Sequence, residues 1–114
     1  MPDCIFCRIA AGEIPSRVVH SDDEIFAFED INPQAPVHVL VIPRKHIPTL
    51  NDLTAEDDAL IGRLHRAAVR IARERGVSGP GYRLVLNCNA HAGQSVWHVH
   101  LHLLGGRVLQ WPPG

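Results

Sequence analysis

The chain has 114 residues, 46% of them hydrophobic and 20% charged, and its formal net charge is −1 at pH 7. This length fits a single domain over residues 1–114, and the apolar share excludes a disordered chain. The near balance of charge gives no electrostatic reason to expect a nucleic acid as partner, and no apolar run approaches the roughly 18 residues of a membrane span.

The predicted elements, taken in chain order, mix short strands with one short and one long helix. The long helix is the clearest: Thr54 can cap its start, apolar residues recur every three or four positions, and Gly76 ends it. Short turns between neighbouring strands favour an α+β fold with an antiparallel sheet covered by helices. The expected ranges are a helix over 5–11, strands over 18–20, 24–28 and 38–42, a helix over 54–75, and strands over 82–86 and 96–104.

Three of the eight histidines, His98, His100 and His102, alternate with aliphatic residues in the last predicted strand. Successive side chains of a strand point to opposite faces, so the three imidazoles share one face at a spacing of roughly 6.5 to 7 Å. Such a row is too widely spaced to ligate one small ion by itself. A polar surface face and a three-histidine zinc site remain alternatives.

Phosphorus chemistry explains this pattern best. A neutral imidazole attacks phosphorus without a base to activate it, and a second imidazole on the same face can hydrogen-bond a phosphoryl oxygen. The preceding Gly93, Gln94 and Ser95 add a turn with backbone N–H groups and a hydroxyl, which can hold phosphate oxygens or assist a leaving group.

Cys4 and Cys7 have the spacing of half a zinc site, and two histidines would have to complete it. A redox pair would need a thioredoxin-like context that the sequence lacks, and two unpaired thiols are the remaining alternative. Three cysteines without a secretory signal favour a reducing, cytoplasmic location.

Residues 98–104 match the pattern His-φ-His-φ-His-φ-φ, in which φ is hydrophobic, and therefore resemble the signature of the histidine triad (HIT) family. Further stretches are similar to the branch of histidine triad nucleotide-binding proteins. These stretches are 30–36, 41–46, 93–97, 104–107 and 111–114.

The resemblance implies a HIT-like five-stranded antiparallel sheet with one long and one short helix, dimerising into a ten-stranded sheet. The implied activity is hydrolysis of purine nucleoside phosphoramidates, such as AMP linked to an amine or lysine, to the nucleoside monophosphate. His100 would be the nucleophile that carries a nucleotidyl-histidine intermediate, His102 would bind phosphate or the bridging atom, and Ser95 would assist the departing amine.

The resemblance also implies the roles of the surrounding residues. His38 would support the catalytic strand, and Zn²⁺ would be held structurally by Cys4, Cys7, His46 and the first histidine of the triad, His98. The implied substrate-binding residues are Asp30 for the ribose, Asn87, Gly93 and Val96 near the phosphate, Phe6, Ile9, Phe28 and Ile31 around the base, and Trp111, whose tail would reach the neighbouring subunit.

Two other functions remain open at this point. A nucleotide-binding interaction module would bind a protein partner and would hydrolyse its nucleotide only incidentally. A dinucleoside polyphosphate hydrolase ranks lower, because the glutamine typical of that branch at the last triad position is replaced by His102.

Overall fold

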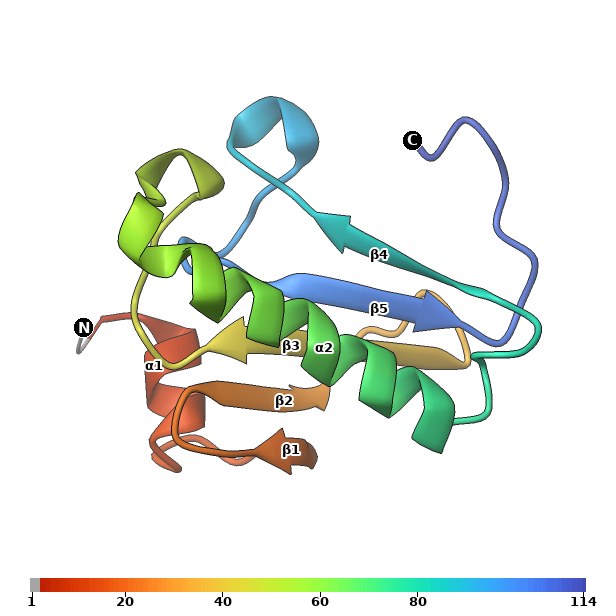
Figure 1. The fold of residues 1–114 in the computed structure, drawn as a ribbon, viewed down its shortest axis with the longest axis horizontal. Helices are drawn as coiled ribbons and strands as arrows, with labels where there is room; N and C mark the ends of the chain where they lie inside the picture. The colour runs from red at the N-terminus through yellow and green to blue at the C-terminus, as the bar shows by residue number, and fades with distance from the viewer. Residues whose placement is uncertain (1–2) are drawn as a thin grey trace.

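The computed structural model describes residues 3–114. Its five strands form one sheet in which every neighbouring pair is antiparallel (Figure 1). The strands are β1 (Val18–Ser21), β2 (Ile25–Glu29), β3 (Val37–Pro43), β4 (Tyr82–Leu86) and β5 (Leu101–Gly105), in the spatial order β1-β2-β3-β5-β4. Among the described residues, no helix is both long and apolar enough to cross a membrane.

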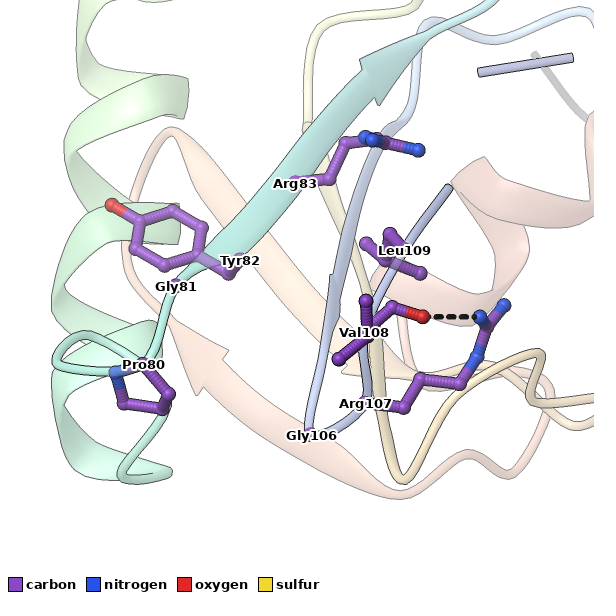
Figure 2. A pocket seen from close by; sticks show the side chains of 8 residues that line it. All are labelled: Pro80, Gly81, Tyr82, Arg83, Gly106, Arg107, Val108 and Leu109. Carbon is purple, nitrogen blue, oxygen red and sulfur yellow. Dashed lines mark hydrogen bonds between the residues drawn. The ribbon is translucent and has the colours of Figure 1, made fainter. Parts of the chain in front are cut away.

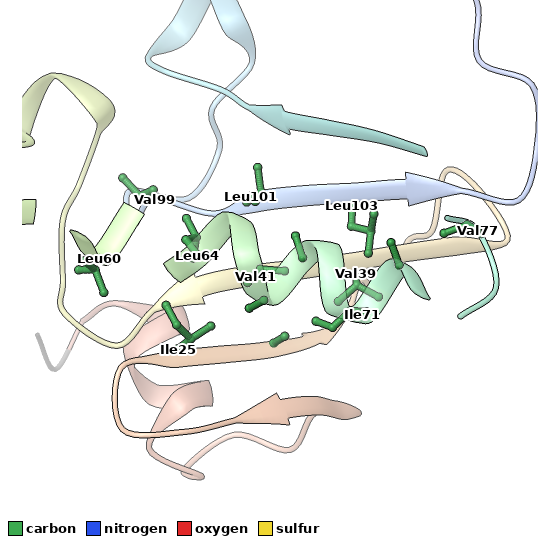
Figure 3. Close-up of a cluster of buried hydrophobic side chains, with 14 of the residues drawn as sticks. Ile25, Val39, Val41, Leu60, Leu64, Ile71, Val77, Val99, Leu101 and Leu103 are labelled. Atoms are coloured by element: carbon green, nitrogen blue, oxygen red, sulfur yellow. The ribbon is translucent and has the colours of Figure 1, made fainter. Parts of the chain in front are cut away.

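One face of the sheet is covered by the long helix α2 (Asp58–Glu74) (Figures 1 and 3). The helix is preceded by a 3₁₀ turn at Ala55–Asp57, where the Asp57 side chain bonds the backbone N–H of Thr54 and so fixes the start. Figure 3 shows the apolar side chains that α2 buries against the sheet, among them Leu64 and Ile71. This layer is the main core, and it fixes the positions of β3 and β5.

The opposite face carries the short helix α1 (Ile5–Ala10) at one end. A second, smaller cluster lies beneath it, made by alternate residues of β2 and β3 together with two residues of the helix. The period of two in a strand explains the division, because Val39 and Val41 face α2 while Leu40 and Ile42 face α1. The members of this second cluster are Phe6, Ile9, Phe26, Phe28, Leu40 and Ile42.

The predicted α+β fold, with a five-stranded antiparallel sheet and one long helix, is confirmed, whereas the predicted dimer is not tested by a single chain. Most boundaries agree with those expected to within one residue, and two differ by more. The helix expected over 54–75 begins only at Asp58, because the capping residues form the separate 3₁₀ turn. The strand expected over 96–104 begins at Leu101, because just before it the backbone N–H of Val99 bonds the carbonyl of Ile47 and the His98 ring bonds the carbonyl of Pro43, both outside the ladder.

Candidate active site and metal centre

The three histidines of the ladder lie on the face that carries α1, while Val99, Leu101 and Leu103 enter the core beneath α2. The three side chains share this face even though regular strand pairing starts only at Leu101. The ring centroids of His100 and His102 are 5.0 Å apart, closer than the strand spacing alone predicts, because the rings tilt toward each other. The sequence therefore predicted the shared face correctly but not how close the rings come.

His38 reaches this face from β3 and fixes the protonation of His102. The backbone N–H of Gln34 donates to Nδ1 of His38 at 3.0 Å, so a neutral His38 carries its proton on Nε2. That Nε2 lies 2.9 Å from Nδ1 of His102, which must accept. His102 then carries its own proton on Nε2, where it can donate to a ligand.

His100 is fixed in the opposite tautomer. Its Nδ1 lies 2.7 Å from the carbonyl oxygen of His98, which can only accept, so Nδ1 carries the proton. The Nε2 of a neutral His100 therefore keeps a free lone pair. The Phe6 ring stands edge-on to this imidazole at 5.0 Å and restricts its orientation. One imidazole is thus prepared to attack and its neighbour to donate.

Burial keeps these rings neutral at physiological pH. Removal from water, and to a smaller extent the nearby imidazoles of His100 and His38, lower the pKa of His102 to about 4. Burial likewise lowers the pKa of His100 and of His38, although the carboxylate of Asp30 opposes the shift at both. Neutral rings are what both tautomer assignments require.

Asp30, His38 and His102 also lie close enough together to resemble a metal site. The Oδ2 of Asp30 is 3.4 Å from Nε2 of His38. However, the Gln34 N–H occupies Nδ1 of His38, so Nε2 of this ring carries the proton and has no lone pair for an ion. The two histidines are therefore joined by a hydrogen bond, with the Asp30 carboxylate close by, rather than forming a metal centre.

A second cluster brings together the four residues that the resemblance to the histidine triad family implies as metal ligands. Cys4 and Cys7 come from the start of α1, His46 follows β3, and His98 is fully buried ahead of β5. One donor atom from each lies within 4.8 Å of all the others. Nε2 of His98 donates to the carbonyl of Pro43 at 2.7 Å, which leaves Nδ1 unprotonated and facing the cluster.

The spacing of these donors fits a tetrahedral zinc ion. Bonds of about 2.3 Å to sulfur and about 2.05 Å to nitrogen place sulfur and nitrogen about 3.6 Å apart and the two nitrogens about 3.3 Å apart. Nδ1 of His98 lies 3.3 Å from Sγ of Cys4, 3.5 Å from Sγ of Cys7 and 3.3 Å from Nδ1 of His46. Burial lowers the pKa of His98 to about 4, so its ring is neutral and able to ligate.

The remaining predicted site residues fall into three groups. Three of them, Phe6, Ile9 and Phe28, are buried in the cluster beneath α1, and Val96 packs against it. Asp30 and Asn87 are half-buried directly after β2 and β4, respectively. The others are exposed, namely Gly93, Ser95, Ile31 and Trp111.

The backbone groups that set the tautomers were missing from the sequence interpretation. The Gln34 N–H and the Pro43 carbonyl each bond a histidine ring, and each comes from a different part of the chain. Every residue offers such groups, so no sequence signal distinguishes these two. Only the tertiary structure identifies them.

Comparisons with known proteins agree with this arrangement. A family model described as "Scavenger mRNA decapping enzyme C-term binding" matches residues 3–109. The purine nucleoside phosphoramidase of Escherichia coli K12 is 50% identical over 107 residues, which cover 94% of this chain and 90% of that protein.

Solved structures are similar over almost the whole chain. The HIT family hydrolase from Legionella pneumophila has a TM-score of 0.97 and 54% identity, covering 98% of this chain and 100% of that one. A histidine triad protein from Clostridium difficile has a TM-score of 0.94 and 44% identity, covering 96% of each chain. The chain belongs to the histidine triad family.

Proposed function

We propose that the chain hydrolyses purine nucleoside phosphoramidates to nucleoside monophosphates through a covalent nucleotidyl-histidine intermediate on His100. The observation that carries the proposal is the pair of opposite tautomers. The carbonyl of His98 leaves Nε2 of His100 with a free lone pair, and the chain from Gln34 through His38 gives Nε2 of His102 a proton. The similarity to the E. coli phosphoramidase supports the same reaction.

In the first step, Nε2 of His100 attacks the α-phosphorus and the bond from phosphorus to the amine nitrogen breaks. The hydroxyl of Ser95 donates a hydrogen bond and passes a proton to the amine nitrogen, so that the amine leaves as a neutral molecule, and the hydroxyl takes a proton back from solvent. His102 donates from Nε2 to the phosphoryl oxygen or the bridging atom, where charge builds up. Water then attacks the phosphorus of the intermediate, which releases the nucleoside monophosphate and restores the imidazole.

The nucleoside would bind beside this group. Asp30 follows β2 and lies close to His102, and its carboxylate would accept hydrogen bonds from the ribose hydroxyls. Phe6 and Phe28, whose ring centroids are 5.5 Å apart, form an aromatic wall next to His100 for the purine, with Ile9 and Ile31 completing the base pocket. Asn87, Gly93 and Val96 would border the phosphate, as the family motif implies.

The proposal is tested by comparing the rates of hydrolysis of adenosine and guanosine phosphoramidates with that of a dinucleoside polyphosphate. Mass spectrometry of the quenched protein then detects any covalent intermediate. We expect rapid release of monophosphate from the phosphoramidates and a nucleotidyl adduct on the peptide that contains His100. Slow hydrolysis of every phosphoramidate, together with tight binding of a protein partner, would instead favour an interaction module.

Replacing His102 with alanine removes a single hydrogen-bond donor to the transition state. We expect kcat on an adenosine phosphoramidate to fall by about 10²-fold, the usual cost of losing one such donor. His38→Ala is a useful second variant, because it leaves the His102 ring in place and removes only the hydrogen bond that fixes its tautomer. We expect its kcat to fall by less than that of His102→Ala. Equal rates for His102→Ala and wild type would rule out the donor role.

We propose that zinc occupies the Cys4, Cys7, His46 and His98 cluster and that its role is structural. Four protein ligands would leave no open coordination position, so the ion would take no part in the reaction. It would join α1 to the segment after β3 and to the stretch before β5, and it would hold His98, whose carbonyl orients His100. Cys4, Cys7 and Cys88 form no disulfide, which suits a reducing cytoplasm.

We also propose that residues 1–114 form one domain that works as a homodimer. β4 is an edge strand with all five residues half-buried, whereas β1, the other edge, is shorter and has an irregular register. The C-terminal segment lies beside β4 and lines a pocket of about 480 Å³ with it (Figure 2). Arg83 of β4 donates to the carbonyl of Gln110 at 3.0 Å, so Trp111, 80% exposed, projects from this edge.

A ten-stranded sheet joined at β4 would cover this edge. Sedimentation equilibrium at micromolar concentration should therefore give twice the 12.6 kDa of one chain. A mass of 12.6 kDa throughout the concentration range would contradict the dimer and the role of Trp111 in a neighbouring site.

A further inference from the structure

Gln94 is a buried polar residue between two exposed ones, Gly93 and Ser95. Its side chain is only 7% exposed, which is unusual for a glutamine. The reaction described above gives it no role. Its surroundings are the loop after β4, the segment that follows β3, and the stretch that leads into the histidine ladder.

The Gln94 amide makes three hydrogen bonds, one at its oxygen and two at its nitrogen. Its Oε1 accepts from the backbone N–H of Asn89 at 2.8 Å, while Nε2 donates to the carbonyls of Pro48 at 2.7 Å and Val96 at 3.1 Å. The orientation of the amide is unambiguous, because the Asn89 group can only donate and both carbonyls can only accept. The backbone N–H of Gln94 also bonds the Asn89 carbonyl at 3.2 Å, which closes the loop into a ring.

These bonds enclose Ser95 on both sides. The residue before it is anchored to Asn89 and Pro48, and the carbonyl after it, on Val96, is held by the same amide. Residues 95–97 belong to no strand or helix, so no ladder supports them. The next side chain that fixes this stretch is His98, whose Nε2 donates to the carbonyl of Pro43. The position of the Ser95 backbone therefore depends on Gln94.

We infer that Gln94 is a positioning residue for departure of the amine, acting through Ser95. This rests on the proposed function, in which the Ser95 hydroxyl protonates the leaving amine. Without the hydrogen bonds of the Gln94 amide, the Ser95 hydroxyl would no longer be held near the amine nitrogen. A displacement of about 1 Å can lower the rate by about 10²-fold. The later attack of water on the intermediate does not use the amine, so it should be insensitive to Gln94.

The test compares Gln94→Met, which keeps the length of the side chain but none of its hydrogen bonds, with wild type in rapid-quench experiments. Two substrates are used, an alkylamine phosphoramidate of AMP and the p-nitrophenyl ester of AMP, whose leaving group departs as an anion without a proton. For Gln94→Met we expect formation of the intermediate to slow by about 10²-fold with the alkylamine and by less than threefold with the ester. Hydrolysis of the intermediate should keep its wild-type rate.

A purely structural role would slow both substrates and both steps alike, and that result would overturn the inference. A double variant of Ser95→Ala and Gln94→Met gives a second measure. If both residues act on the same proton transfer, Gln94→Met should slow the reaction of the Ser95→Ala variant with the alkylamine substrate only slightly further. A full additional loss in the double variant would also count against the inference. Failure of the proposed function is separate, since wild type would then form no nucleotidyl adduct at all.

Discussion

The substitution His100→Ala should lower kcat on an adenosine phosphoramidate by at least about 10⁴-fold, as expected when an enzyme loses its attacking nucleophile. The only free imidazole lone pair that the described residues direct toward the proposed substrate site is Nε2 of His100. His102 cannot replace it, because its Nδ1 accepts from His38 and its Nε2 carries the proton. The loss should therefore not be made up by the neighbouring ring.

Nucleotide binding should survive this substitution. The residues proposed to hold the nucleoside, Asp30 and the aromatic pair Phe6 and Phe28, make no hydrogen bond to His100, and Phe6 keeps its contact with Phe28. Calorimetry with AMP should thus give a Kd within a few fold of the wild type, together with an unchanged circular dichroism spectrum.

His20→Ala is a suitable control for His100→Ala. His20 lies in β1, at the far edge of the sheet, and bonds only the neighbouring Asp22 at 2.7 Å. It should retain wild-type kcat. If His100→Ala kept a comparable rate and still formed a nucleotidyl adduct, His100 would not be the nucleophile.

The sequence predicted the catalytic face because that prediction depends only on the period of a strand. Alternation places His98, His100 and His102 together whether or not the strand is regular, and the aliphatic residues between them provide the core contacts that fix the face. The long helix was predictable for a similar reason, since its apolar stripe and Gly76 are local signals. The boundaries that were misplaced by more than one residue are the start of this helix, at Asp58 rather than residue 54, and the start of the last strand, at Leu101 rather than residue 96.

The differences between the three histidines could not be predicted from local pattern. His98 faces the cysteines because its Nε2 bonds Pro43, and His100 differs from His102 because one bonds a carbonyl and the other a histidine 64 positions away. Such partners meet only after β3 and β5 have paired. The resemblance to the family implies different roles for the three residues, and the tertiary structure gives each ring a different hydrogen-bond partner.

Removal of zinc should be the largest single change in stability. The chain purified without chelators should contain about one zinc ion, and an ion at a thousand times its Kd stabilises the folded state by about 4 kcal/mol. For a domain of this size, 1 kcal/mol shifts the melting temperature by about 4 °C, so loss of the ion should lower it by roughly 15 °C. Cys4→Ser with Cys7→Ser should lower it by a similar amount, because a hydroxyl is a poor ligand for this ion.

Cys88→Ser is the matched control, because it replaces the one cysteine that lies outside the cluster. It should keep the zinc content and should not respond differently to a chelator. The ligands come from α1, the segment after β3 and the stretch before β5, so loss of the ion should release α1 first and expose the Phe6 side of the nucleoside pocket. Hydrogen exchange would then rise at residues 4–10 before the sheet opens. Zinc far below one ion per chain, or a melting temperature that a chelator leaves unchanged, would mean that hydrogen bonds among the four side chains hold α1 in place without a metal.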